Sequence, residues 1–284
     1  MKKTPFRIII SIVLIILNFF VWQSVFDGND GNGLLKIIFL DVGQGDSILI
    51  DDSFGNQVLI DGGTGENILE KLDKYLPFYD RTIEMVLLTH PDYDHLGGLL
   101  KVLESYSVDT FVYSGLKKDS NSYEALISLL DENELEITIA KQGQIIELGN
   151  GAKLHVLYPE DSLENFETEK FNEYSIITKL VFNDFEALLP GDAGFPLEVR
   201  LLNSGIDLSA DLLKIGHHGS RYSTHSLFLM KVDPDVAVIS SGENSFGHPH
   251  PDVLGKLEDI LTLRTDTEGD IEVLTDGKKV WIGD

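Results

Sequence analysis

The chain has 284 residues, of which 43% are hydrophobic and 24% charged, so it can build a globular core and is not expected to be disordered. It contains no cysteine, which excludes disulfide bonds and thiolate metal sites and leaves histidine and carboxylate side chains as metal ligands. Its 22 basic and 47 acidic residues give a net charge of −25, which argues against tight, nonspecific binding of nucleic acid.

The first 27 residues are separate from the globular part and predict a membrane anchor. Residues 8–26 carry no charge, and Lys2, Lys3 and Arg7 precede them. An uncharged stretch of this length fits a helix that crosses a bilayer once, with its basic flank in the cytoplasm. We therefore expect a single-pass protein of the cell membrane, with residues 28–33 as a polar linker and residues 34–284 as a domain outside the cytoplasm. A cleaved signal peptide, which would give a secreted protein, is the alternative.

The globular part begins with three predicted strands, residues 34–40, 47–50 and 57–60. Two turns beside them, residues 41–46 and 61–63, place glycine next to an aspartate. Such glycines indicate backbone that approaches another segment closely, although a simple hairpin turn is the better explanation of the first turn taken alone. Asp61 lies at the end of the third strand. Two interpretations of it stay open, namely that it supports a metal site and that it has no role there.

Residues 89–98, with the sequence THPDYDHLGG, carry the strongest chemical signal in the chain. They follow an apolar run, residues 83–88, that predicts a buried strand, and they precede residues 99–103, which predict a helix. We expect the loop between them to present His90, Asp92, Asp94 and His95. Imidazole nitrogens and carboxylate oxygens are ligands of divalent metal ions, and this density of ligands would let one loop serve two adjacent ions.

Strand and helix signals alternate through the rest of the chain and predict a layered α/β sandwich. They fall at residues 109–113, 123–130, 137–140, 145–148 and 153–158, followed by a hairpin of residues 174–182 and 185–189. Polar groups again follow predicted strands. Asp192 follows the hairpin, His217 and His218 follow residues 211–215, and His248 follows residues 236–240. An acidic loop, residues 160–173, is expected to be solvated.

These motifs together resemble the metallo-β-lactamase superfamily, which implies an αββα sandwich with a metal pair at its edge. More narrowly, residues 39–46 (FLDVGQGD), Gly216–Ser220 (GHHGS) and residues 247–251 (GHPHP) resemble the soluble hydrolase domain of ComEC-type competence proteins. The similarity runs from about Leu35 to Trp281. The channel-forming membrane portion of those proteins has no counterpart in the sequence, so a role in DNA translocation is not carried over.

The resemblance implies one or two divalent ions, Zn²⁺ or Mn²⁺. It assigns one ion to Asp94, His95, Asp192 and one of His217 and His218, of which we favour His218. His217 would then face the substrate. The other ion would be held by His90 and Asp92, with Asp192 as the bridge.

This chain departs from the superfamily pattern at the second site. Asp92 stands where a second histidine is usual, and the further histidine expected before Asp192 is not evident. His155 lies within a predicted strand and is interpreted as structural, while Asn172 and Ser175 match an Asn-x-x-Ser pattern of the relatives. The His90 site is therefore poorer in nitrogen donors and suits a harder ion such as Mn²⁺.

The chemistry expected of paired ions is hydrolysis by activated water, with both oxygens of an in-line displacement at phosphorus held by metal. Asp94, His217 and His248 are the residues expected to take part. His248 is the best candidate for a general acid or for contacting a phosphate oxygen, and a structural loop histidine is the alternative.

We therefore expect a membrane-anchored metal-dependent hydrolase of phosphodiester bonds, in DNA or another polymer outside the cytoplasm. Two other classes stay open. One is a metallo-hydrolase of another ester, such as a lactone, a thioester or a choline-phosphate ester, because one fold hosts many reactions. The other is a binding domain without catalysis in a DNA-uptake or envelope assembly. The sequence does not indicate an oligomeric state.

Overall fold

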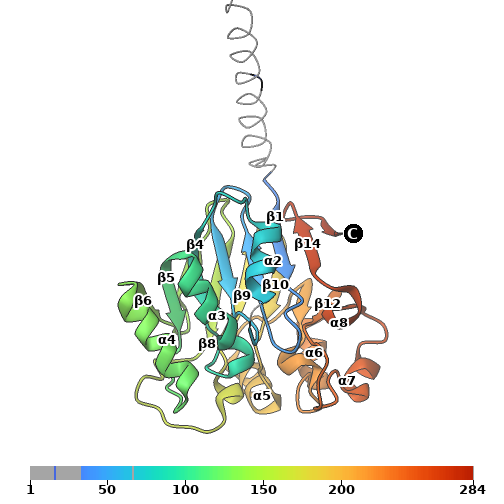
Figure 1. Ribbon diagram of the computed structural model, residues 1–284. Helices are drawn as coiled ribbons and strands as arrows, with labels where there is room; N and C mark the ends of the chain where they lie inside the picture. Colours follow the sequence, from blue (N-terminus) through green and yellow to red (C-terminus); the bar gives the residue numbers. More distant parts are fainter. Residues whose placement is uncertain (1–15, 17–32, 66, 284) are drawn as a thin grey trace, which may run out of the picture.

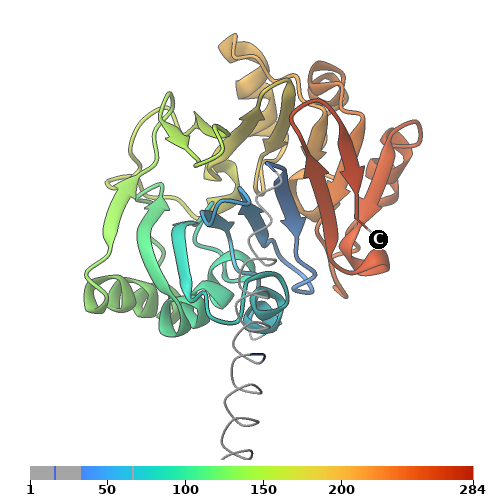
Figure 2. The ribbon, with the colours of Figure 1, turned by 90° about the horizontal axis from the view of Figure 1, so that it is seen from above.

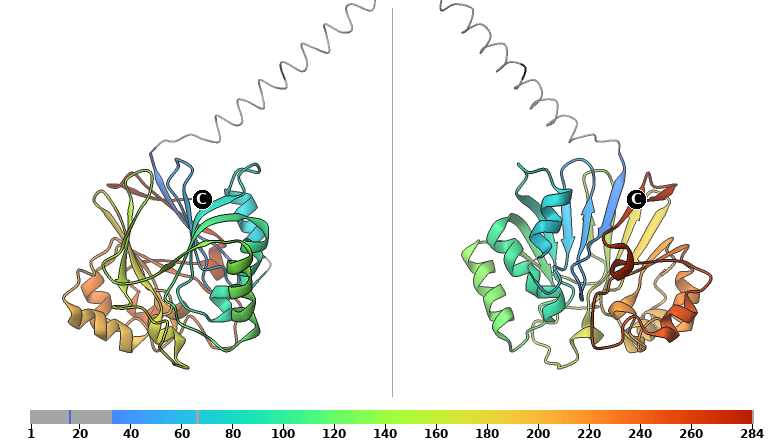
Figure 3. Two further views of the ribbon diagram at one scale, coloured as in Figure 1. Left: turned by 90° about the vertical axis from the view of Figure 1, so that its left-hand side faces the viewer. Right: turned by 45° about the vertical axis from the view of Figure 1, so that its right-hand side comes forward.

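The computed structural model describes Ile16 and residues 33–65 and 67–283. Within this part, two β-sheets face each other and helices cover their outer faces (Figures 1 and 3). No helix of the described part is long and apolar enough to cross a membrane. The predicted anchor, residues 8–26, lies outside the described residues except for Ile16, so the anchor stays a prediction.

The first sheet of the described part runs through the N-terminal half of the domain and takes its last two strands from the C-terminus. The central pairs β3–β4 and β4–β5 are parallel, whereas β1 pairs antiparallel with both β2 and β14. In spatial order the strands are β15 (Val280–Ile282), β14 (Ile271–Thr275), β1 (Leu35–Phe39), β2 (Ile48–Asp51), β3 (Gln57–Ile60), β4 (Thr82–Leu87), β5 (Ser107–Tyr113) and β6 (Glu136–Ile139).

The second sheet combines an antiparallel part, β7 to β10, with a parallel part, β10 to β13. In spatial order its strands are β13 (Leu261–Arg264), β12 (Val236–Ile239), β11 (Leu212–Lys214), β10 (Phe185–Leu189), β9 (Ile177–Phe182), β8 (Lys153–Tyr158) and β7 (Ile145–Glu147). Figure 2 shows the two sheets side by side when the molecule is seen from above.

Three apolar layers hold these elements together. Successive residues of a strand point to opposite faces, and β1 illustrates the result: Ile37 packs between the sheets, whereas Ile38 packs outward under the helices. The outer layer of the first sheet contacts α2 (Asn67–Tyr75), α3 (Tyr93–Ser105) and α4 (Asn121–Glu132). The outer layer of the second sheet contacts α5 (Phe195–Ser204), α6 (Ser226–Val232) and α7 (Pro251–Lys256). The predicted α/β sandwich of two sheets is confirmed.

The parallel strands of both sheets end at the same edge of the sandwich, opposite the edge at which β1 begins (Figure 1). The chain segments that follow β3, β4, β10 and β11 therefore meet there. Loops after the carboxyl ends of parallel strands commonly carry the functional groups of α/β proteins. This edge carries the residues that the sequence analysis singled out.

The start of α3 differs from the expectation. The helix begins at Tyr93 and not after the glycine pair, so Asp94 and His95 lie on its first turn, while His90 precedes the helix and Asp92 is the residue at its N-cap. Position 98 lies inside the helix and requires glycine, because the backbone of another turn lies against it. A Cβ at Gly98 would be 1.9 Å from the carbonyl oxygen of Gly62.

The turn that contains Gly45 also approaches α3 and is more than a hairpin turn. A Cβ at Gly45 would lie 2.1 Å from the carbonyl oxygen of Asp94, and Gly45 has a φ of +127°, which favours glycine. The backbone N–H of Asp46 donates to the carbonyl of Asp94 at 3.3 Å, and that of Gly62 to the carbonyl of His95 at 2.8 Å. The two glycine turns therefore fix the first turn of α3, which confirms the close approach predicted for them.

Candidate metal centre

Four of the predicted ligands come together at this edge. Asp94 and His95 come from α3, Asp192 follows β10, and His218 lies in the 3₁₀ turn η2 (Gly216–Gly219) after β11. Asp192 Oδ2 is 3.4 Å from His95 Nε2 and 3.3 Å from His218 Nε2, and Asp94 Oδ2 is 3.3 Å from the same His218 nitrogen. One ligand atom from each residue lies within 4.8 Å of the others. We call Asp94, His95, Asp192 and His218 the inner group.

The imidazole rings of the inner group are oriented by contacts at Nδ1, the ring nitrogen that does not face the other ligands. His95 Nδ1 is 2.7 Å from Asp61 Oδ2, and His218 Nδ1 is 3.0 Å from the carbonyl oxygen of Ser240. A hydrogen bond at Nδ1 leaves Nε2 as the atom that faces the other ligands, which is the usual arrangement of metal-bound histidines. The Nε2 atoms of His90, His95 and His218 are all buried and have no hydrogen-bond partner.

These unpartnered atoms fit a metal ion. Buried polar atoms are normally hydrogen-bonded, so several that converge without partners indicate a site for a ligand. Two imidazole nitrogens and two carboxylate oxygens form a donor set that Zn²⁺ accepts, and Mn²⁺ also accepts nitrogen and oxygen donors. The inner group would hold such an ion through the Nε2 atoms of His95 and His218 and carboxylate oxygens of Asp94 and Asp192.

The electrostatics of the inner group also favour a cation. Burial opposes a charge on His95, but Asp192 and Asp61 outweigh it and raise the pKa of His95 well above its usual value. For His218 burial is likewise outweighed, by Asp192 and Asp46, and its pKa is raised well above the usual value. A site that stabilises protonated imidazoles has a negative potential, so binding of a divalent ion would displace those protons.

A ring of polar groups behind the inner group supports it. Asp61 is fully buried and accepts hydrogen bonds from the N–H and the hydroxyl of Thr89, at 2.8 and 2.7 Å, in addition to its contact with His95. Asp46 Oδ1 is 3.3 Å from His218 Nδ1, and its other oxygen forms an ion pair with the buried Lys214. Asp46, Asp61 and His95 also lie close enough together for a metal. Because these carboxylates are engaged by Lys214, Thr89 and His95, we assign them to support.

The other predicted pair, His90 and Asp92, is built differently. His90 Nδ1 is held by the hydroxyls of Ser175 and Thr89, at 3.2 and 3.1 Å, and its Nε2 is 3.5 Å from Asp92 Oδ2. Asp92 is an ion-pair partner of Lys118. We call His90 and Asp92 the outer pair. His155 is part of β8, between its cross-strand partners on β7 and β9, and belongs to neither metal-binding cluster found among the described residues.

His217 lies beside the inner group and does not belong to it. Its Nε2 is 3.9 Å from Asp192 Oδ2 and 3.0 Å from the amide nitrogen of Asn172. Both His217 and His218 have left-handed backbone, with φ of 49° and 53°, and this turn directs the two rings differently. The structure thus places His218 in the inner group and His217 beside it, and the choice of His218 as the ligand stays a prediction.

His248 reaches the site from the loop after β12, where Asn244 holds its backbone through hydrogen bonds of 3.1 and 2.7 Å. Its ring centroid is 5.5 Å from that of His217, and its Nδ1 is buried without a partner. Burial and the neighbouring His217 lower the pKa of His248. Burial also lowers the pKa of His217, against the opposite effect of Asp192. Both imidazoles therefore favour the neutral form, which can accept a proton or a hydrogen bond.

Comparisons with known proteins show the family of this chain. A model of the Metallo-beta-lactamase superfamily matches residues 40–243. ComE operon protein 3 of Bacillus subtilis is 30% identical over 257 residues, which cover 84% of this chain and 32% of that protein. Recombination protein 2 of Haemophilus influenzae is 30% identical over 226 residues, or 77% of this chain and 26% of that protein. The chain spans about a third or less of the length of these relatives.

Solved structures share the fold. Igni18, a metallo hydrolase from Ignicoccus hospitalis, superimposes with a TM-score of 0.56 at 14% identity over 84% of this chain and 98% of its own. YhfI, a metallo-beta-lactamase fold protein from Bacillus subtilis, gives a TM-score of 0.52 at 13% identity over 88% of this chain and 100% of its own. With a family model that covers most of the domain, these folds and two curated relatives, the chain belongs to the metallo-β-lactamase superfamily and is similar to ComEC-type competence proteins.

Proposed function

We propose that the protein is a metal-dependent hydrolase of phosphodiester bonds. The observation that carries this proposal is the convergence of unpartnered Nε2 atoms of His95 and His218 beside the carboxylates of Asp94 and Asp192. A divalent ion held by these four residues would supply a Lewis acid and would lower the pKa of bound water toward neutrality, which suits attack at phosphorus.

The cavity beside the inner group offers hydrogen-bond donors to a small reacting group. A cavity of about 250 Å³ opens beside it, and its lining includes Asp192, His217, Asn172, Lys170 and Tyr222. The amide of Asn172 can donate to a phosphate oxygen, and so can the ammonium of Lys170, which pairs with Glu173 of the same lining at 3.0 Å. We assign to His248 the transfer of a proton to or from the reacting group, because its Nδ1 has no partner and its ring stands next to His217.

DNA is the first substrate to consider, because relatives carry the names ComE operon protein 3 and Competence protein ComA. The same names support our proposal that the protein works in a DNA-uptake or envelope assembly. The net charge of −25 acts against binding of a long polyanion and favours a second candidate, hydrolysis of another ester such as a lactone, a thioester or a choline-phosphate ester.

A substrate panel tests the activity. The protein, loaded with Mn²⁺ or Zn²⁺, is assayed on bis-p-nitrophenyl phosphate, plasmid, single-stranded DNA, RNA, a lactone, a thioester and a β-lactam. We expect hydrolysis of the diester that stops on chelation and is lost in Asp192→Asn, because Asp192 contacts both histidines of the inner group. Opening of a lactone or thioester without any diester hydrolysis would replace the first candidate with the second. No turnover of any substrate would favour a binding domain.

We also propose that residues 8–26 anchor the protein in the cell membrane with the domain outside the cytoplasm. β1 begins at Leu35, at the edge of the sandwich opposite the metal centre, and its five residues span roughly 17 Å. An anchor before β1 would thus leave the centre facing away from the bilayer. A reporter fused after Asp284 should be active outside the cytoplasm and stay with the membrane fraction. A cytoplasmic signal would contradict the orientation, and a soluble exported product would indicate cleavage.

A further inference from the structure

Lys118 lies beside the metal centre, in a segment that contains none of the ligand motifs. It lies between β5 and α4, and its ammonium forms an ion pair with Asp92 Oδ1. The other oxygen of Asp92 is 3.5 Å from His90 Nε2. The Asp92 carboxylate is therefore shared between an ammonium group and an imidazole. A second metal ion at the outer pair would need that same carboxylate.

The position of Lys118 is fixed on more than one side. Its Nζ lies 4.8 Å from the centroid of the Phe171 ring, and Phe171 is buried. Phe171 opens the 3₁₀ turn η1 (Phe171–Tyr174), and Ser175, directly after it, holds His90. Only about a quarter of each side chain in the Lys118–Asp92 pair is exposed, at 26% and 25%. A half-buried ion pair backed by an aromatic face is screened less by solvent than a surface pair.

We propose that Lys118 supplies the second positive charge of this centre, so that the site holds one tightly bound metal ion and a lysine in place of a second. The proposal rests on the proposed metal-dependent function and specifies its site. An ammonium paired with Asp92 neutralises the only carboxylate of the outer pair and repels a divalent ion a few ångströms away. The outer pair then offers a second ion one free imidazole nitrogen, at His90.

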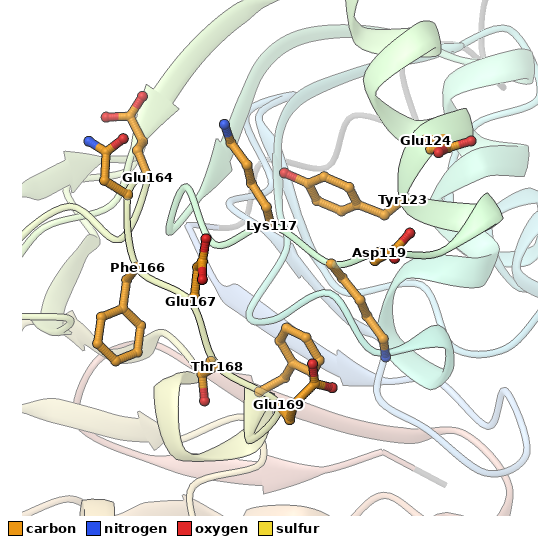
Figure 4. A pocket seen from close by; sticks show the side chains of 12 residues that line it. Lys117, Asp119, Tyr123, Glu124, Glu164, Phe166, Glu167, Thr168 and Glu169 are labelled. Atoms are coloured by element: carbon orange, nitrogen blue, oxygen red, sulfur yellow. The ribbon is translucent and has the colours of Figure 1, made fainter.

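Lys118 is also placed to meet a substrate. It lines a cleft of about 820 Å³ between the segment of Lys117 and the loop that carries Glu164, Glu167 and Glu169 (Figure 4). An ammonium group has three N–H donors, and the ion pair with Asp92 engages one of them. A remaining donor can bind a phosphate oxygen, which is a function that a second metal ion would otherwise perform.

Counting bound ions tests the proposal without reference to turnover. Metal-stripped protein is dialysed to equilibrium against Mn²⁺ or Zn²⁺ over a range of concentrations, and ions per chain are measured by elemental analysis. We expect one tight ion in the wild type and in Lys118→Arg, which keeps the charge. Lys118→Met removes the charge but keeps a long side chain. This variant should bind two ions per chain, whereas the wild type should bind one. Lys117→Met, at the exposed neighbour, should behave as the wild type.

Addition of Asp92→Asn to Lys118→Met should abolish the second ion, which would locate that ion at the outer pair. Equal numbers and affinities of ions in the wild type and Lys118→Met would overturn the proposal, and so would two tight ions in the wild type. Circular dichroism of each variant confirms that folded protein is compared, and Lys118→Gln repeats the test if Lys118→Met does not fold. A protein that binds ions as expected but hydrolyses no diester would refute the proposed activity and leave the role of Lys118 intact.

Discussion

The outer pair and two members of the inner group, Asp94 and His95, come from the same six-residue stretch, yet their surroundings in the fold differ. His95 and its partners are supported by buried groups that leave their Nε2 atoms free and surround them with negative charge. His90 is also buried, but Asp92 beside it is already paired with Lys118. Ligand chemistry alone therefore does not define a metal site. We expect the charge and the support behind each ligand to decide which of two similar groups holds an ion tightly.

The largest difference is expected between two histidine substitutions that the motif alone would treat as equal. His95→Ala should lose the tightly bound ion and all metal-dependent turnover, because His95 is a member of the inner group. His90→Ala should retain that ion. The measurement is the number of ions per chain after mild chelation, with melting temperature as the control for folding. Loss of the ion in His90→Ala would mean that the two groups form one coupled site.

A smaller effect is expected at His248, which faces the centre without belonging to either group. His248→Ala should keep its metal and lower kcat on a model diester by roughly 10²–10⁴-fold, as is typical for a lost general acid or base. His155→Ala is the matched control, since His155 is half-buried in β8, and we expect it to affect stability and not kcat. Loss of metal in His155→Ala together with full activity in His248→Ala would reverse these assignments.

The support behind the inner group can be tested at Asp61. Asp61→Asn keeps the size of the side chain but removes the charge that His95 contacts at 2.7 Å, so metal affinity should fall by about 10–100-fold. Competition with a chelating dye measures this affinity. Asp51→Asn, at the far end of the first sheet and paired with Lys36 at 3.6 Å, should leave it unchanged. An unchanged affinity in Asp61→Asn would show that the charge behind His95 is not what makes the inner group tight.

Much of the fold could be predicted because its strands are apolar runs between turn residues. β3, β8 and β10 have the predicted bounds. The start of α3 could not be predicted from the sequence. Gly97 and Gly98 directly precede the predicted helix, and two adjacent glycines suggest a turn. Their real constraint comes from contact with the turn at Gly62, which is distant in the sequence. Local signals thus predict elements, whereas close backbone contacts between elements stay hidden.

The candidate ligands could be proposed from the sequence because a chain without cysteine restricts metal ligands to histidine and carboxylate side chains. The groups that support or compete with them could not. Lys118 is 26 residues from Asp92 and is charged in an ordinary-looking loop. Lys214 gave a usable signal, a lysine inside an apolar strand, and the structure pairs it with Asp46. A charge at a position expected to be buried predicts a buried partner, although the sequence does not say which.

The smallest effect on turnover is expected at Glu198, which supports the segment after His218 from further away. Its two carboxylate oxygens accept the N–H groups of Thr224 and His225 at 2.6 and 2.7 Å. Burial nevertheless raises the pKa of Glu198 from 4.5 to about 7. Between these values the unfolded chain has released the proton and the folded chain retains it, so stability falls as pH rises through this interval. The raised pKa corresponds to a loss of about 3 kcal/mol in the free energy of unfolding as the pH rises from 4.5 to about 7.

Glu198→Gln removes the titration, so the difference in unfolding free energy between the wild type and this variant should change by about that amount, with the wild type gaining relative stability toward pH 4.5. Urea unfolding of the metal-stripped proteins at several pH values measures it, and the other titrating groups, histidines of the inner group included, cancel in the difference. Glu243→Gln, at an exposed carboxylate, is the control. Parallel pH profiles for the wild type and Glu198→Gln would mean that the two N–H donors keep Glu198 ionised in the fold. The support of the inner group would then include a second buried charge beside that of Asp61.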